Sequence, residues 1–262
     1  MQILITNDDG IHAPGIVALA EAFSEVGEVT VVGPEFEQSG VSHALTFLTP
    51  LFVNEMESRN PKVKRFAVNG TPSDCAKLGI LELCPQKPDL VVSGINGGLN
   101  VGINCLYSGT LAGAREAALF NVPAFAVSID VVHKGVHEPR HVNRAAELSR
   151  PLILELLKSE ISAGSYFNIN YPIFALENDA QTKFVSMETR RFDYNFEKGT
   201  DPVGRPYYWT AHTAKNIAHG ELTDLMAVQK GHVTVTPMTF DLTDHQLLSD
   251  SPQRRMIDPS NG

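Results

Sequence analysis

Short apolar runs that alternate with helical patterns constrain the fold of this chain more than any other feature. Runs rich in Val, Ile and Leu are typical of buried strands in a parallel sheet. Four such runs occupy residues 2–6, 28–32, 89–92 and 124–129. Apolar residues at helical spacing lie between them, over residues 15–24, 73–83 and 109–120. This order predicts an α/β fold with a Rossmann-like, doubly wound and mostly parallel sheet.

The second half of the chain is expected to be less regular and richer in strands. A strand is expected at residues 166–171, with further strands at 183–188 and 207–213. The stretch between the last two, residues 190–206, is polar and holds two glycines and two prolines. We therefore expect a protruding hairpin or arm in this region, of the kind that protomers often exchange.

Composition and charge exclude several classes of protein. The 262 residues are 43% hydrophobic and 19% charged, as expected for a globular enzyme. A formal net charge of -9 argues against a general nucleic-acid-binding surface. No basic and apolar leader opens the chain and no run approaches the ~20 apolar residues of a membrane span. We expect a cytoplasmic protein with no membrane anchor and no stable nucleic-acid partner.

An acid pair, Asp8 and Asp9, follows the first predicted strand and precedes Gly10. Open α/β sheets bind ligands outside the carboxyl ends of their strands, where this pair is expected. Two adjacent carboxylates repel each other unless a positive charge joins them, and divalent cations with hard oxygen ligands suit that role. The alternative is a solvated acidic turn, because Asn-Asp-Asp-Gly is also favourable turn chemistry.

Polar residues follow two more predicted strands, at residues 37–43 and 93–102. The carboxyl ends of parallel strands meet at one edge of a sheet, so these loops should approach the acid pair. Two Asp carboxylates, a Ser hydroxyl and an Asn carbonyl would form a partly open shell of oxygen ligands. Such a shell suits Mg²⁺, Mn²⁺ or Ca²⁺ better than zinc.

The segment Tyr107-Ser108-Gly109-Thr110 opens a predicted helix. A helix N-terminus with hydroxyl groups beside it can bind phosphate, although Ser108 could equally be an ordinary N-cap. Proximity to an acidic metal site favours the phosphate interpretation. His12 and His43 lie near the expected site, where each could be a general acid, a phosphate contact or a side chain with no part in chemistry.

Several familiar nucleotide and hydrolase motifs are absent from the sequence. It contains no P-loop GxxxxGK[ST], no GxGxxG after the first strand, no GxSxG and no HExxH. The expected phosphate chemistry must therefore rest on another arrangement of residues.

A set of short motifs runs through nearly the whole chain in a fixed order. They are ITNDDG at residues 5–10, QSG at 38–40, NGTPSDC at 69–75, SGINGGLN at 93–100, YSGT at 107–110, TDP at 200–202, GRPYYW at 204–209, TD at 223–224 and VTVTP at 233–237. In this order they resemble the survival protein SurE family, metal-dependent nucleotidases that release phosphate from nucleoside monophosphates. Residues 191–198 match no part of that pattern.

The resemblance implies a site and a cofactor. It implies one divalent cation per subunit, Mg²⁺ or Mn²⁺, with ligands at Asp8, Asp9, Ser39 and Asn96. Asp8 and Asp9 are then the catalytic residues. We expect phosphate contacts from residues at the strand ends and at the helix start, namely Asn7, Gly40, Ser108, Gly109 and Thr110. His43 remains a possible acid, base or substrate contact.

The resemblance also implies an organisation for the chain. It implies a single SurE-like domain over residues 1–262, with a nucleotidase core at 1–165 and a β-rich extension at 166–250. That extension is expected to join subunits into a dimer or tetramer. Residues 251–262 are expected to be a loose tail.

We therefore expect a metal-dependent 5'-nucleotidase that hydrolyses nucleoside monophosphates. A water activated by the cation is the expected nucleophile, with direct attack by Asp8 as the alternative. Two other functions remain open: a non-catalytic nucleotide-binding sensor, and a phosphatase that prefers polyphosphate or sugar phosphates. The acid pair argues against the sensor, which has little need of two metal-binding carboxylates.

Overall fold

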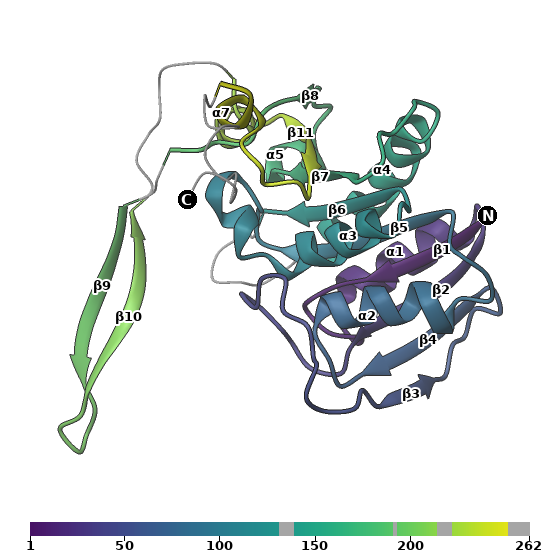
Figure 1. Cartoon of the computed structure of the whole chain (residues 1–262), viewed down its shortest axis with the longest axis horizontal. Coiled ribbons are helices and arrows are strands. Elements are labelled where there is room, and N and C mark those ends of the chain that lie inside the picture. The colour runs from purple at the N-terminus through teal and green to yellow at the C-terminus, as the bar shows by residue number, and fades with distance from the viewer. Residues whose placement is uncertain (131–138, 191–192, 214–221, 251–262) are drawn as a thin grey trace, which may run out of the picture.

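A nine-stranded sheet forms the centre of the computed structural model, which describes residues 1–130, 139–190, 193–213 and 222–250 (Figure 1). In sheet order the strands are β3 (Val53–Met56), β4 (Val63–Val68), β2 (Glu28–Pro34), β1 (Gln2–Thr6), β5 (Leu90–Gly97), β6 (Ala124–Ile129), β7 (Ser165–Tyr171), β11 (Val233–Thr239) and β8 (Thr182–Phe184). From β4 to β7 every neighbouring pair is parallel. The predicted Rossmann-like α/β fold is confirmed.

The sheet extends in two opposite directions from the central pair β1 and β5. From β1 the chain builds outward through β2 to β4, and after β5 it builds through β6 to β7 on the other side. The two strands at this switch point are parallel and paired, with Ile3 opposite Leu90 and Thr6 opposite Ser93. A crevice forms outside the carboxyl ends of strands at such a switch point. The loops after β1 and β5 therefore face the same space.

Helices cover both faces of the sheet. Helices α1 (Pro14–Ser24) and α4 (Pro139–Leu156) pack together on one face, while α2 (Pro72–Leu78) and α3 (Gly109–Leu119) pack together on the other. Successive side chains of a strand point to opposite faces. In β1, Ile3 and Ile5 belong to one apolar cluster and Leu4 to the other. Burial on both faces explains why the strands of the sequence are almost uninterrupted apolar runs.

Three elements differ clearly from the ranges that the sequence predicts. The strand expected at residues 183–188 covers only Thr182–Phe184. The helix expected at residues 73–83 ends at Leu78, and a π-helical turn, Gly79–Leu83, follows it. The strand expected to end at residue 92 continues to Gly97, with a shift in register against β6 between Ser93 and Asn96. This longer strand carries Asn96 to the edge of the crevice.

The C-terminal half adds antiparallel strands, as expected. Strands β9 (Asp193–Thr200) and β10 (Pro206–Thr213) form a separate two-stranded hairpin, here called the arm, which projects from the body of the molecule (Figure 1). The polar stretch at residues 190–206, where a hairpin or arm is expected, thus contains the whole of β9 and the turn that follows it. The turn is closed by Asp201, whose carboxylate accepts hydrogen bonds from the Arg205 backbone and guanidinium.

The arm is the only part of the described C-terminal half that has a sheet to itself. Strands β7 and β11 pair with each other inside the main sheet, and β8 pairs with β11 at its edge. Three short helices, α5 (Ile173–Glu177), α6 (Asp224–Gln229) and α7 (His245–Asp250), complete this half. The tail expected at residues 251–262 lies outside the described residues. Across the described ranges, no helix combines the length and apolar character needed to cross a bilayer.

Candidate active site

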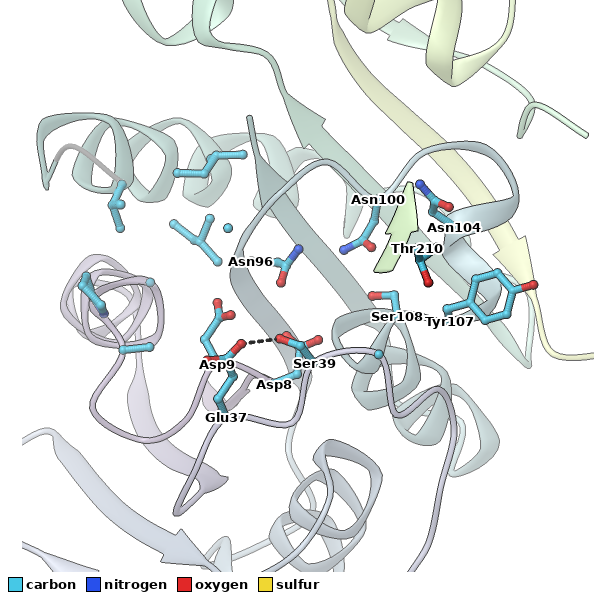
Figure 2. A pocket seen from close by; sticks show the side chains of 18 residues that line it. Asp8, Asp9, Glu37, Ser39, Asn96, Asn100, Asn104, Tyr107, Ser108 and Thr210 are labelled. Atoms are coloured by element: carbon cyan, nitrogen blue, oxygen red, sulfur yellow. Dashed lines mark hydrogen bonds between the residues drawn. The ribbon is translucent and has the colours of Figure 1, made fainter. Parts of the chain in front are cut away.

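A cavity of about 910 Å³ lies at the switch point between β1 and β5. Its acidic end carries Asp8, Asp9, Glu37 and Ser39, and Figure 2 shows these side chains close together. Its other end carries Asn104, Tyr107 and Thr210, with Asn96 and Asn100 between the two ends. The cavity therefore brings together three loops that the sequence predicts at this edge of the sheet.

Asp8 is fixed by the start of helix α3. Its side chain is only 4% exposed, and both carboxylate oxygens accept hydrogen bonds from Thr110. The Thr110 N–H lies 3.0 Å from Oδ2 and the Thr110 hydroxyl 2.6 Å from Oδ1. Burial raises the pKa of Asp8, while these hydrogen bonds and the positive end of the helix favour the anion.

Gly109 allows this close approach of the helix to Asp8. A Cβ atom at position 109 would lie 2.9 Å from both Cβ and Oδ2 of Asp8. Real Cβ atoms do not approach so closely, so any larger residue would push the helix and the carboxylate apart. The absence of a side chain at Gly109 therefore lets helix α3 hold the Asp8 carboxylate in place.

Asp9 lies closer to the solvent of the cavity than Asp8. Burial, followed by the charge of Asp8, raises its pKa from 3.8 to about 7, against a hydrogen bond from the Gly97 backbone. Glu37 adds a weaker repulsion. The acid pair is therefore poorly compensated by protein alone, and a cation bound between the two carboxylates would relieve this repulsion.

Ser39 and Asn96 supply neutral oxygen atoms beside the acid pair. The loop that carries Ser39 is held there by a 2.7 Å hydrogen bond from the Gln38 N–H to the Asp8 carbonyl. The Ser39 hydroxyl donates to Glu37 Oε1 at 2.6 Å (Figure 2). The Asn96 amide nitrogen donates to the Gly98 carbonyl at 2.7 Å, which leaves its oxygen to act as a ligand. Two carboxylates, a hydroxyl and an amide oxygen fit Mg²⁺ or Mn²⁺.

Carboxylates alone do not supply enough ligands for a metal ion at this position. Within the described residues, no three His, Cys, Asp or Glu side chains gather closely enough to hold a metal ion. A cation at the acid pair therefore needs the neutral oxygens of Ser39 and Asn96 as well. All four residues expected as metal ligands line the same cavity.

The five residues expected to contact phosphate take different positions. Gly40 and Ser108 line the cavity, and Ser108 also caps helix α3 by accepting a hydrogen bond from the Leu111 N–H. Gly109 and Thr110 lie behind Asp8, outside the lining. Asn7 is fully buried and its amide donates to the Gly10 carbonyl, so it shapes the turn. Only Gly40 and Ser108 are positioned to meet a ligand directly.

His43 is not among the residues that line the cavity. Its Nε2 lies 2.7 Å from Oε2 of Glu116, a carboxylate on α3 with 2% of its side chain exposed. Lys77 lies 3.5 Å from the other Glu116 oxygen. This position favours a role in anchoring the Ser39 loop over contact with a substrate. His12, the other histidine considered, is exposed and also outside the lining.

Sequence reasoning missed five polar residues that line the cavity: Glu37, Asn100, Asn104, Tyr107 and Thr210. The first four lie within or beside the loops already singled out, and Glu37 precedes Ser39 by two positions. Thr210 has no local signal, because it comes from strand β10 of the arm. The fold and this cavity together define a Rossmann-like α/β protein with an acidic cavity at the switch point of its sheet.

The family model described as "Survival protein SurE" matches residues 3–194. The chain therefore belongs to the SurE family, as its ordered motifs indicate.

Relatives of known name match almost the whole chain. The 5'-nucleotidase SurE of Rhodopirellula baltica is 44% identical over 251 residues, which cover 95% of this chain and 97% of the relative. The 5'-nucleotidase SurE of Geobacter sulfurreducens is 43% identical over 249 residues, covering 95% and 92%. The crystal structure of the SurE protein from Aquifex aeolicus is 35% identical, with a TM-score of 0.79, and the match covers 95% of this chain and 97% of that one.

Proposed function

We propose that this chain is a metal-dependent 5'-nucleotidase that hydrolyses nucleoside monophosphates to a nucleoside and phosphate. The names of its relatives support a nucleotidase. The observation that carries the proposal is the acid pair: Asp8 is fixed by Thr110, and Asp9 beside it has a pKa raised to about 7. Such a pair at the mouth of a switch-point crevice is suited to hold a cation against a phosphate.

The proposed metal ligands are Asp8, Asp9, Ser39 and Asn96, with one Mg²⁺ or Mn²⁺ per subunit. A divalent cation, when bound, neutralises charge on the phosphoryl group and lowers the pKa of water at the site. The Ser39 hydroxyl can act as a ligand without losing its proton, because that proton is accepted by Glu37.

The contacts of Asp8 are compatible with a ligand role. Each of its oxygens accepts one hydrogen bond from Thr110 and keeps a lone pair that a cation can use. The proposed nucleophile is a water activated by that cation. Ser108 and the backbone near Gly40 are the proposed contacts for the phosphoryl oxygens, because both line the cavity beside the acid pair.

Self-association through the C-terminal extension is the second part of the proposal. The arm exposes Phe196, Tyr207, Tyr208 and Trp209, whose side chains are 45% to 70% accessible. Aromatic side chains are enriched at protein interfaces. They support a dimer or tetramer in which the arm contacts another subunit. A cytoplasmic location completes the proposal.

Phosphate release from a panel of substrates tests the proposed activity. The panel contains nucleoside monophosphates, a sugar phosphate and short polyphosphate, each assayed with EDTA and then with Mg²⁺ or Mn²⁺ restored. We expect EDTA to abolish release, metal to restore it, and nucleoside monophosphates to be preferred. Faster release from polyphosphate or the sugar phosphate would reassign the substrate. Binding of nucleotides without release from any substrate would favour a sensor.

A further inference from the structure

Two segments that flank the arm in the sequence meet in one small cluster, here called the arm root, made of Ser186, Glu188, Thr223 and Asp224. The Asp224 N–H donates to the Ser186 carbonyl at 2.9 Å, and the Glu188 N–H donates to Asp224 Oδ1 at 2.9 Å. The Thr223 hydroxyl donates to Glu188 at 3.1 Å. The described segments before and after the arm are thus bonded to each other.

The other oxygen of Asp224 bonds to a segment that leads to the cavity wall. The Gly102 N–H donates to Asp224 Oδ2 at 2.8 Å, across 122 residues of sequence. Gly102 begins a 3-10 helix, Gly102–Leu106, which carries Asn104 and leads directly to Tyr107. Asn104 and Tyr107 line the cavity at the end away from the acid pair. One side chain therefore joins the arm root to the cavity wall.

Asp224 is fully buried, with 0% of its surface exposed. A buried carboxylate is costly unless hydrogen bonds satisfy it. Three backbone N–H groups do so here: Gly102 on one oxygen, Glu188 and Leu225 on the other. Only a side chain with two acceptor oxygens can bond to both segments at once. This geometry makes Asp224 a bridge, whereas a carboxylate that merely capped helix α6 would not need Gly102.

The arm itself also reaches the same wall. Thr210 of β10 lines the cavity, and Figure 2 shows it beside Asn104 and Tyr107. The wall opposite the acid pair therefore includes residues 102–107 and Thr210 of the arm. Asp224 is bonded to the first of these segments, at Gly102, and to Glu188, which precedes the arm in the sequence. An aromatic ring, an amide and a hydroxyl are suited to a flat, polar ligand such as a nucleoside.

We propose that Asp224 is a positioning residue that sets the arm and residues 102–107 relative to each other, and thereby shapes the wall that binds the nucleoside part of the substrate. This inference rests on the proposed nucleotidase function. The acidic end, where phosphate binds, shares none of the hydrogen bonds of Asp224. Loss of the bridge should therefore weaken binding of nucleotides and leave binding of phosphate alone unchanged.

Asp224→Asn breaks the bridge selectively. The amide oxygen can still accept from Glu188 and Leu225, but the amide nitrogen then faces the Gly102 N–H, donor against donor. We expect the KM for AMP to rise about tenfold, with little change in the inhibition constant of inorganic phosphate or in the Mn²⁺ concentration for half-maximal activity. Asp89→Asn is the matched control, because Asp89 also accepts a backbone N–H from a distant segment, that of Gln2 at 2.8 Å, but precedes β5 at the end of the sheet away from the cavity; its KM should stay within twofold.

Two results would overturn the inference. One is an unchanged KM for AMP in Asp224→Asn, and the other is an equal rise in the KM and in the inhibition constant of phosphate, which would indicate general damage. If the wild-type protein releases no phosphate from any nucleotide, the proposed function fails, which is a separate outcome.

If Asp224→Asn does not fold, hydrogen exchange of the wild-type protein tests the proposed bridge between Gly102 and Glu188. A non-hydrolysable phosphonate analogue of AMP should slow exchange in peptides that contain Gly102 and in those that contain Glu188, while inorganic phosphate should slow neither. Protection that is confined to the Gly102 peptides, or that phosphate reproduces, would overturn the proposed bridge.

Discussion

The acid pair and the arm are held in place in opposite ways. Asp8 is 4% exposed, and its two oxygens are bonded to a helix that packs on the sheet. The arm has no third strand, and Trp209 and Phe196 on it are 70% and 67% exposed. An isolated two-stranded hairpin is at best marginally stable in water. The chain alone therefore builds the acidic end of the site, whereas aromatic side chains of the arm stay exposed among the described residues.

Replacing a carboxylate of the acid pair should have the largest effect. Asp9→Asn removes a proposed metal ligand and should lower metal-dependent phosphate release by at least roughly 100-fold, since even residues behind a metal ligand cost 10–100-fold when changed. Asp201→Asn, a carboxylate in the turn of the arm, is the control and should leave release within twofold. Equal losses in the two variants would contradict the distinction between the regions.

Gly109→Ala tests how closely helix α3 must approach Asp8. The new Cβ would lie 2.9 Å from Asp8 Oδ2, so the carboxylate must shift, and we expect roughly 10- to 100-fold slower release, as for other residues behind a metal ligand. Gly204→Ala in the arm is the control, because nothing lies within 4 Å of its Cβ and only its φ of +86° opposes the change. Normal kinetics for Gly109→Ala would show that this approach does not matter.

Trp209→Ala tests whether the arm is covered by another subunit. Truncation of a tryptophan at an interface often costs 2 kcal/mol or more, so the dissociation constant of the oligomer should rise at least roughly tenfold. Sedimentation velocity over a range of concentrations measures this constant. Because the side chain is exposed within one chain, the thermal midpoint of the isolated subunit should not fall. An unchanged dissociation constant would mean that Trp209 does not contribute to an interface between subunits.

The raised pKa of Asp9 predicts how metal binding depends on pH. In the metal-free protein this carboxyl is protonated below about pH 7, so protons compete with the cation there. Mn²⁺ affinity, measured by titration calorimetry, should rise up to roughly tenfold per pH unit below 7 and level off above it. Affinity that does not change between pH 6 and 8 would contradict a ligand role for Asp9.

The thermal stability of the metal-free protein should fall as the pH rises, whereas its Mn²⁺ affinity increases. The pKa of Asp9 is higher folded, about 7, than its ordinary value of 3.8, so its contribution favours the folded state at low pH. That contribution is lost as the pH rises from about 4 through 7. The melting midpoint in EDTA should therefore fall over this range, and it should fall less in Asp9→Asn.

His43→Gln should have the smallest effect if the histidine anchors the Ser39 loop. Glutamine can still donate a hydrogen bond to Glu116, so we expect a loss of less than about tenfold with an unchanged pH profile. Loss of a general acid or base typically costs 10²- to 10⁴-fold. A loss of that size, with one limb of the pH profile removed, would restore a chemical role to His43.

The parallel strands and the acid pair could be predicted because their signals are local. A strand buried on both faces must be apolar throughout, and Asp8 and Asp9 follow such a strand directly. The position of β1 beside β5 then follows from the order of elements. The same reasoning brings Ser39 and Asn96 to this edge, because each follows or ends a neighbouring strand.

Other features depend on contacts between distant segments and could not be predicted. Thr110 lies at the helix start where a phosphate contact is expected, but its N–H and hydroxyl bond to Asp8 instead. A hairpin or arm could be predicted at residues 190–206, but the bounds of β9 could not, because it pairs only with β10 and its sequence lacks the apolar alternation of a half-buried strand. Asp224 and Gly102 are 122 residues apart, and neither residue alone indicates the bond between them.

Anomalous scattering from crystals grown with Mn²⁺ tests the central claim most directly. The claim is that the switch-point crevice binds one cation between Asp8, Asp9, Ser39 and Asn96. We predict a single anomalous peak per subunit within about 2.0–2.4 Å of these oxygens, the range of hard-cation bonds, and no peak there in Asp9→Asn crystals. A peak elsewhere in the chain, or none at this crevice at saturating Mn²⁺ and neutral pH, would contradict the account.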